Sequence, residues 1–362
     1  MKIGIIAPPW VPVPPVAYGG TELVIDTLAR GLAVAGHDVE LFATGDSTCP
    51  VDTKYLLEEA EGQRIANSCI EIKHLIAGYT ELAKDVDIIH DHTLLGPIYG
   101  PSVTDTPIVT TNHFPYSDDT HLIWEQVTQG RGKIISISHH HASLASPDTV
   151  VDTVIHHGVD ISRFPDGAGE GGYLAFLGRM VTQKGVHTAV EVARKAGMPL
   201  KIAAKMREPR EIEYFEKHVK PYLTSDIEYL GELGPKDKFE LLSGAKALLN
   251  PIRWHEPFGM VMIESMACGT PVIVFPQGAA PEIVTDGLTG FVVNNEDEMV
   301  KAVGKVDQIN RRACKFEVET RFSMKRMVQD HVDFYEKAIA ESHTPAVVET
   351  EQIDLAAKSI KL

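Results

Sequence analysis

Short apolar runs alternate with amphipathic helical stretches along the first forty-five residues of the chain. Residues Lys2–Ala7 form an apolar run typical of a buried parallel strand. A proline-rich loop ends at Gly19 and Gly20, and apolar positions then recur at helical spacing as far as Gly36, which is placed to end the helix. Val39–Ala43 is a second predicted strand. Strands and helices that alternate at this spacing indicate an α/β fold with a parallel sheet.

The same order of elements returns in the middle of the chain. Tyr173–Leu177 is a predicted strand, Gly178–Gly185 a polar loop, Val186–Ala196 a helix and Leu200–Ala204 the next strand. A chain of 362 residues also exceeds what one hydrophobic core usually serves. We therefore expect two nucleotide-fold domains in tandem.

The glycine-rich segment Asp160–Gly172 is the expected connector between these domains. Its glycines match the spacing of a dinucleotide-binding loop, but they precede a strand instead of following one, so we interpret them as a linker. We predict a first domain over residues 1–163 and a second over 164–324. Apolar residues at helical spacing over Phe322–Ile339 predict a C-terminal helix, placed at about 325–343 and packed back on the first domain.

Composition excludes several classes of function. The formal net charge is -16, which argues against a broad nucleic-acid surface and against docking on anionic lipid. The apolar run at the N-terminus is too short for a signal peptide, and no stretch has the length of a membrane span. We expect a cytoplasmic protein with no stable membrane insertion. Its cysteines lack paired spacing and are expected to be reduced thiols: Cys49, Cys69, Cys268 and Cys314.

The segment Trp254–Phe275 carries the most informative chemistry. Its stretch Phe258–Met260 opens a predicted helix, where free backbone N–H groups and the positive end of the helix dipole favour a phosphate. Gly259 lets a ligand approach the backbone closely. Glu256 and Glu264 supply carboxylates, which suit hydroxyl-rich ligands. Taken alone, the pair is equally compatible with a purely structural interpretation, in which Glu256 caps the helix and Glu264 is a solvated side chain.

The loop Gly178–Gly185 is a second candidate, because ligands of open α/β sheets bind at the carboxyl ends of strands. Arg179 offers a planar fork for a diphosphate, and Lys184 offers a mobile point charge. Together they could neutralise a leaving diphosphate without a metal ion. As an isolated pair they are more typical of surface charges on a loop.

Three segments in this order resemble the retaining glycosyltransferases of family 4: GRMVTQKG from Gly178, EPFGMVMIESMACGTPVI from Glu256, and GAAPEIVTDGLTGFVV from Gly278. GGTE from Gly19 and VIHHGVD from Val154 agree with it, and the resemblance extends from Lys2 to about Lys337. It implies the GT-B fold, in which two Rossmann-like domains present parallel sheets across a central cleft.

The resemblance implies a role for each residue of the second domain that matches. Arg179 and Lys184, in the loop that begins at Gly178, would hold the donor diphosphate. Glu256, with the backbone of Phe258, Gly259 and Met260, would hold the transferred sugar and the distal phosphate. The ribose would lie on Glu264, and the base beside Leu233.

Two further matches lie in the first domain. Gly19 and Gly20 would approach the phosphates or the acceptor. His113, in VTTNHF after a predicted strand, matches the active-site histidine that touches the sugar. One departure is His157, which stands where the family commonly has asparagine.

The expected function is retaining transfer of a hexose, with UDP-glucose as the first candidate donor, to a small-molecule or glycan acceptor. The nucleotide sugar is a substrate, and no further cofactor and no metal are expected. The runs His90–His92 and His139–His141 lack the spacing of a metal site and show no evident third ligand. Three alternatives stay open: a catalytically silent nucleotide-sugar binding module, a sugar-nucleotide epimerase and a phosphorylase.

Overall fold

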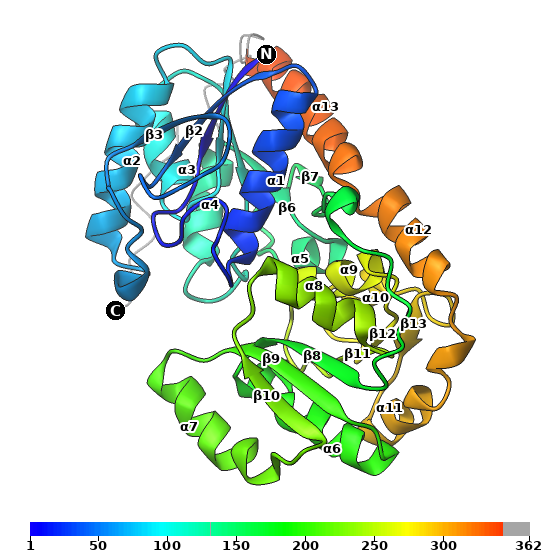
Figure 1. The fold of residues 1–362 in the computed structure, drawn as a ribbon. Coiled ribbons are helices and arrows are strands. Elements are labelled where there is room, and N and C mark those ends of the chain that lie inside the picture. The colour runs from blue at the N-terminus through cyan, green and yellow to red at the C-terminus, as the bar shows by residue number, and fades with distance from the viewer. Residues whose placement is uncertain (131, 343–362) are drawn as a thin grey trace.

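The computed structural model describes residues 1–130 and 132–342, which form two α/β domains, one above the other in Figure 1. Each domain is built on one wholly parallel sheet, as the sequence predicts. The first sheet has the order β3-β2-β1-β4-β5-β6-β7 and the second the order β10-β9-β8-β11-β12-β13. The pair of Rossmann-like domains predicted from the sequence is thus confirmed.

The strands are short and mostly buried on both faces, so they read as continuous apolar runs in the sequence. The strands of the first sheet are β1 Lys2–Ile6, β2 Asp38–Ala43, β3 Asp52–Tyr55, β4 Ile88–Asp91, β5 Ile108–Thr111, β6 Lys133–Ser136 and β7 Thr153–Val154. Those of the second sheet are β8 Leu174–Arg179, β9 Leu200–Lys205, β10 Ile227–Gly231, β11 Leu248–Asn250, β12 Val272–Val274 and β13 Gly290–Val292.

Helices connect the strands and pack around both sheets (Figure 1). In the first domain they are α1 Gly20–Val34, α2 Ser68–Leu82, α3 Gly96–Tyr99, α4 His121–Gln129 and α5 His139–Ser143. From the second domain onward they are α6 Val186–Ala196, α7 Pro209–His218, α8 Pro235–Gly244, α9 Met260–Ala267, α10 Ala280–Ile283, α11 Glu296–Val303, α12 Arg311–Arg321 and α13 Met324–Ser342. Short 3₁₀ turns add η1 Gly62–Arg64, η2 Gly100–Ser102, η3 Ile161–Arg163, η4 Thr182–Lys184, η5 Lys220–Tyr222 and η6 Val306–Gln308.

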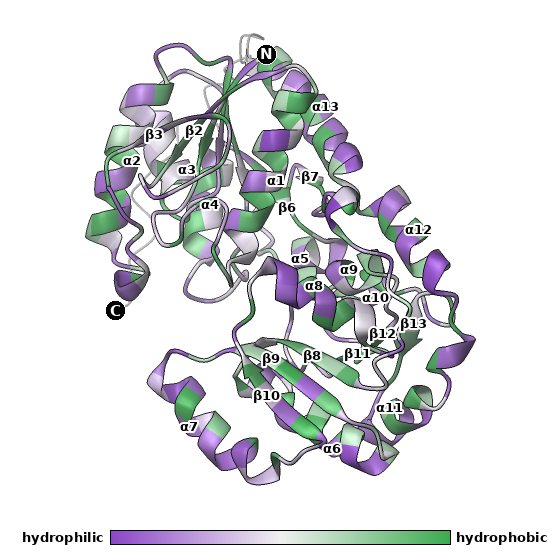
Figure 2. Cartoon of the chain, viewed as in Figure 1, coloured by the Kyte–Doolittle hydropathy of each residue, from purple (hydrophilic) through white to green (hydrophobic). Residues whose placement is uncertain are grey.

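The apolar residues of each sheet form the cores against which the helices pack. Figure 2 shows hydrophobic positions along the strands and mixed hydrophobic and hydrophilic positions along α13. The apolar face of α13 adds Val328 and Tyr335 to the core of the first domain, where α13 lies beside α1 (Figure 1). Across residues 1–130 and 132–342, none of the helices combines the length and the apolar character that crossing a bilayer requires.

The helix predicted over Phe322–Ile339 begins two residues later, because α12 ends at Arg321 and α13 starts at Met324. The break arises from a partner distant in the sequence. The Val159 N–H donates to the Phe322 carbonyl, and the Met324 N–H donates to the Val159 carbonyl. Residue 343, the last position of the predicted helix, lies outside the described residues.

The expected linker is packed against the second domain. The Gly167 N–H donates to the Cys268 carbonyl, and a Cβ at Gly167 would lie 2.5 Å from the Ser243 carbonyl oxygen. Gly167 and Gly171 therefore allow close packing between backbones, and this part of the segment is not a free connector.

Candidate active site

The two segments singled out in the second domain meet at one edge of its sheet. Strand β8 ends at Arg179 and leads into η4, and the neighbouring strand β11 leads into the loop that carries Glu256. Lys184 Nζ lies 2.5 Å from Glu256 Oε2, with both side chains about 15% exposed or less. The Trp254 indole N–H donates to the same carboxylate oxygen at 2.6 Å. A cation and a carboxylate therefore meet at the carboxyl ends of adjacent parallel strands, where such sheets bind ligands.

Arg179 points toward the carboxylates of α7 and of the residue before it. Its Nε and Nη2 donate to Glu211 Oε1 at 3.0 and 2.9 Å, and Nη2 also donates to Glu208 Oε1 at 3.0 Å. Glu211 is fully buried, whereas the Arg179 side chain is 35% exposed. The fork of the guanidinium is thus held in place from one side while part of it stays open.

Tyr18 is a site residue that the sequence reasoning missed. It precedes Gly19 in the loop of the first domain, and its N–H donates to Glu232 Oε1 of the second domain at 3.0 Å. Desolvation raises the pKa of its phenol, Lys184 and Arg179 lower it, and Glu256 adds to the rise. The Tyr18 phenol therefore interacts electrostatically with Lys184, Arg179 and Glu256 of the second domain. No local sequence pattern predicts this interaction between the domains.

Helix α9 begins beside Glu256. Gly259 has a φ of 98°, and no side chain accepts from the N–H groups of the first turn, of which the Met262 N–H donates to the Gly259 carbonyl at 3.1 Å. Phe258 is 2% exposed and anchors the helix start in the core. Met260 packs against the apolar clusters of both domains. The start of α9 therefore lies where the two domains meet.

Glu264 is not a solvated side chain. It is 3% exposed, and its Oε1 accepts from Lys238 Nζ of α8 at 2.6 Å. Lys238 is a second residue without a signal in the sequence, because the contact depends on how α8 packs on α9. Leu233 lies between β10 and α8 and is partly buried against the same core.

His113 follows β5 and belongs to a line of stacked rings. Its Nε2 lies 2.9 Å from His92 Nδ1, and its ring stacks on His157 at 5.3 Å between centroids. His157 in turn meets Phe258 edge to face at 5.0 Å. Burial lowers the pKa of His113 to about 3, so its ring is neutral. The histidine that departs from the family pattern thus links His113 to the start of α9.

Gly278 supports Glu256 from the loop after β12. It has a φ of 61°, and a Cβ there would lie 2.4 Å from both the backbone nitrogen and the carbonyl oxygen of Glu256. The next residue, Ala279, donates its N–H to the Glu256 carbonyl at 3.0 Å. Only glycine fits this close approach at a positive φ.

The remaining glycines occupy chain turns beside these groups. Gly19 is the N-cap of α1, and Gly20 is its first residue and exposed. Gly178 precedes Arg179 in β8, and a Cβ there would lie 3.9 Å from Lys184 Cγ. The structure thus gathers Lys184, Glu256 and the start of α9 and connects Tyr18 to them, while Glu264 is paired with Lys238.

Two family models match the chain in succession. The model described as Glycosyltransferase Family 4 matches residues 18–163, and the one described as Glycosyl transferases group 1 matches residues 160–318. A glycogen synthase of Mycobacterium tuberculosis is 25% identical over 76% of this chain and 79% of its own length. An alpha-maltose-1-phosphate synthase of Mycolicibacterium smegmatis is 24% identical over 90% of this chain and 97% of its own.

Solved structures share the fold at lower identity. A sucrose-phosphate synthase from Thermosynechococcus elongatus superposes with a TM-score of 0.79 at 18% identity, covering 94% of this chain and 100% of that one. Anabaena HepE in complex with UDP-glucose gives 0.72 at 15% identity, covering 93% and 100%. The chain belongs to the GT4-type glycosyltransferases and has the GT-B fold. It is accordingly a glycosyltransferase.

Proposed function

We propose that this glycosyltransferase moves a hexose from a nucleotide diphosphate sugar to a hydroxyl group of a small-molecule or glycan acceptor, with retention at the anomeric carbon. UDP-glucose is the first candidate donor. The observation that carries the proposal is the contact of Lys184 Nζ with Glu256 Oε2, 2.5 Å apart beside the uncapped start of α9. The likeness in fold to HepE, solved with UDP-glucose, supports the choice of donor.

The chemistry follows from where charge develops. When the bond between the anomeric carbon and the phosphate oxygen breaks, the sugar gains oxocarbenium character and the leaving diphosphate gains negative charge. Arg179, Lys184 and the N–H groups at the start of α9 would stabilise that charge. The Glu256 carboxylate accepts from sugar hydroxyls. The acceptor hydroxyl attacks on the face from which the diphosphate departs and gives its proton to the leaving phosphate oxygen, and no protein nucleophile is assigned.

The positive charges of Arg179 and Lys184 would neutralise the leaving diphosphate without a metal ion, so the proposed reaction is metal-independent. A chelator is expected to leave the turnover unchanged. Complete loss of turnover that Mg²⁺ or Mn²⁺ restores would contradict this part of the proposal.

The donor is tested by thermal unfolding in the presence of UDP-, GDP- and ADP-sugars. The true donor, at about one hundred times its dissociation constant, should add about 2.7 kcal/mol to the free energy of unfolding. NMR of the product then reads the configuration of the new glycosidic bond. An α-configured product from an α-configured donor supports retention, and an inverted product refutes it.

The same assays separate the alternatives. Donor binding without hydrolysis or transfer to any acceptor identifies a binding module. Release of sugar phosphate that depends on inorganic phosphate identifies a phosphorylase, and recovery of an epimerised sugar nucleotide identifies an epimerase. Each of these results would replace the proposed transfer.

A further inference from the structure

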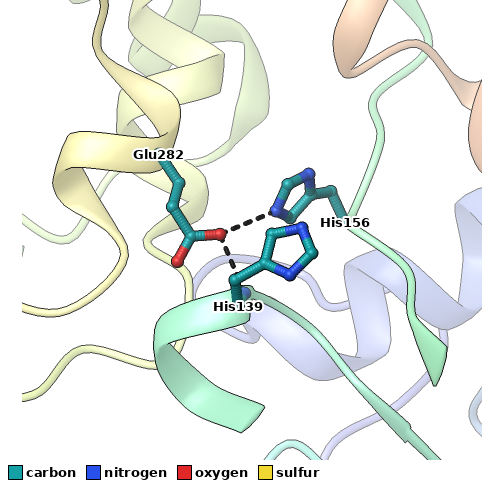
Figure 3. Close-up of side chains that lie close together, drawn as sticks. All are labelled: His139, His156 and Glu282. Atoms are coloured by element: carbon teal, nitrogen blue, oxygen red, sulfur yellow. Dashed lines mark hydrogen bonds and ion pairs between the residues drawn. The ribbon is translucent and has the colours of Figure 1, made fainter. Parts of the chain in front are cut away.

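Three side chains from distant segments meet where the two domains join, apart from the charges at Lys184 and Glu256. His139 opens α5, His156 follows β7, and Glu282 lies on α10 of the second domain. Figure 3 shows both imidazole rings close to the Glu282 carboxylate. His156 and Glu282 are distant from His139 in the sequence, and only the fold brings them together. For this reason the sequence alone shows no third ligand near His139–His141.

The distances suit a small ion. One ligand atom from each of the three residues lies within 4.8 Å of the others. Bonds of about 2.0–2.1 Å to a tetrahedral Zn²⁺ place two ligand atoms roughly 3.3 Å apart. His156 Nε2 and Glu282 Oε2 are already 3.0 Å apart. His139 is exposed, so its ring can turn toward the same point.

Glu282 is held in a fixed orientation by the backbone at the start of α5. Its two oxygens accept the backbone N–H groups of His139 at 2.8 Å and of His140 at 2.5 Å. These bonds hold the carboxylate beside His156 Nε2, which lies 3.0 Å from Glu282 Oε2.

Outer contacts fix the other parts of the cluster. The Glu282 carbonyl accepts from Arg321 Nη2, and the His156 carbonyl accepts from Arg326 Nη2 at 2.7 Å. These hydrogen bonds place the backbones of His156 and Glu282 without using the atoms that would bind an ion.

We propose that His139, His156 and Glu282 form a Zn²⁺ site that ties the first domain to α10 of the second. Two imidazoles and one carboxylate are ligands that Zn²⁺ favours, with water in the fourth position, whereas Mg²⁺ and Ca²⁺ prefer oxygen ligands alone. The ion replaces the proton that His156 Nε2 and Glu282 Oε2 now share. It binds at the domain junction and takes no part in the transfer.

A titration of the full chain with Zn²⁺, after treatment with a chelator and dialysis, tests the site by calorimetry. The wild type should bind one Zn²⁺, and its unfolding temperature should rise with the Zn²⁺ concentration. His139→Ala should weaken the affinity at least about tenfold, because it removes a ligand. Since His139 is exposed, this variant should unfold like the wild type when no metal is added.

His140→Ala is the matched control, because His140 is the next residue and its Nε2 faces His255 Nδ1 at 3.1 Å instead of the cluster. It should bind Zn²⁺ as the wild type does, and Mg²⁺ should bind to none of the three proteins. The proposal is overturned if the wild type binds no Zn²⁺ or if His139→Ala binds it unchanged. It is also overturned if His140→Ala loses the ion, since the His140–His255 pair would then be the site.

Discussion

At the scale of single residues, the site depends on charges that neutralise one another before any ligand arrives. Lys184 is paired with Glu256, and Arg179 with Glu211. A diphosphate that binds Lys184 and Arg179 therefore shares these cations with carboxylates already in place. The cations stay fixed in direction without a ligand, which is the preorganisation that transition-state stabilisation requires.

Gly278→Ala tests the backbone support beneath Glu256. The new Cβ would overlap the Glu256 backbone at 2.4 Å, so Glu256 must move. We expect UDP to bind at least about tenfold more weakly and the free energy of unfolding to fall by about 1–3 kcal/mol, as overpacking does. Calorimetry with UDP and urea unfolding measure the two effects.

Gly287→Ala is the control, because Gly287 has a φ of 73° but nothing within 4 Å of its Cβ position. The Gly287→Ala variant introduces backbone strain without a steric clash, which should lower the free energy of unfolding by about 1–2 kcal/mol and leave UDP binding unchanged. Equal UDP affinity in both variants would show that Gly278 does not position Glu256.

The sequence predicts those site residues that lie in a recognisable local pattern, and it does not predict the others. Lys184 lies in a loop after a predicted strand, where ligands of parallel sheets bind, and Glu256 stands just before a predicted helix. Tyr18 and Lys238 gain their places through packing between domains and between helices. No period or spacing in the chain encodes such contacts.

At the scale of elements, the buried strands with apolar runs were predictable and one helix boundary was not. Buried parallel strands such as β1 and β8 read as apolar runs, which set them apart from the polar loops that follow. The break between α12 and α13 arises because Val159 pairs with the backbone around Ser323. The helical spacing of apolar residues continues across this break, so the sequence pattern does not show it.

Phe322→Ala tests how much that junction contributes. Phe322 is fully buried, and its ring meets Phe258 at 6.1 Å between centroids. We expect the free energy of unfolding to fall by about 3–5 kcal/mol, the usual loss for a buried phenylalanine. Phe316→Ala on α12 is the control, since Phe316 is 62% exposed and should change it by about 0.5 kcal/mol or less. Similar losses in both variants would contradict the anchoring role.

At the scale of the whole molecule, buried neutral histidines make stability depend on pH. Burial lowers the pKa of seven of them, to about 4 in His74, His141 and His331, to about 3 in His113, and well below the usual value in His90, His92 and His157. The folded state binds fewer protons than the unfolded state below pH 6.5, so their contribution is lost as the pH falls from 6.5 toward 4.

Acid should therefore unfold the protein early. Each histidine whose pKa falls to about 3 or 4 contributes about 2 kcal/mol between pH 7 and pH 5. Burial raises the pKa of Glu22 to about 7 and of Asp91 to about 6, which favours the folded state at low pH and offsets only part of the loss. Urea unfolding at pH 7, 6 and 5 should show a fall of several kcal/mol. A midpoint that stays constant over this range would contradict the prediction.

The proposed transfer depends most on Lys184, which would hold the donor diphosphate between the two domains. The most direct measurement is the turnover of the donor sugar nucleotide by Lys184→Ala, with Lys217→Ala on an exposed face of α7 as the control. We predict a loss of about a hundredfold or more in Lys184→Ala, the usual scale for removing a charged transition-state contact, and wild-type turnover in the control. Wild-type turnover in Lys184→Ala would contradict the account.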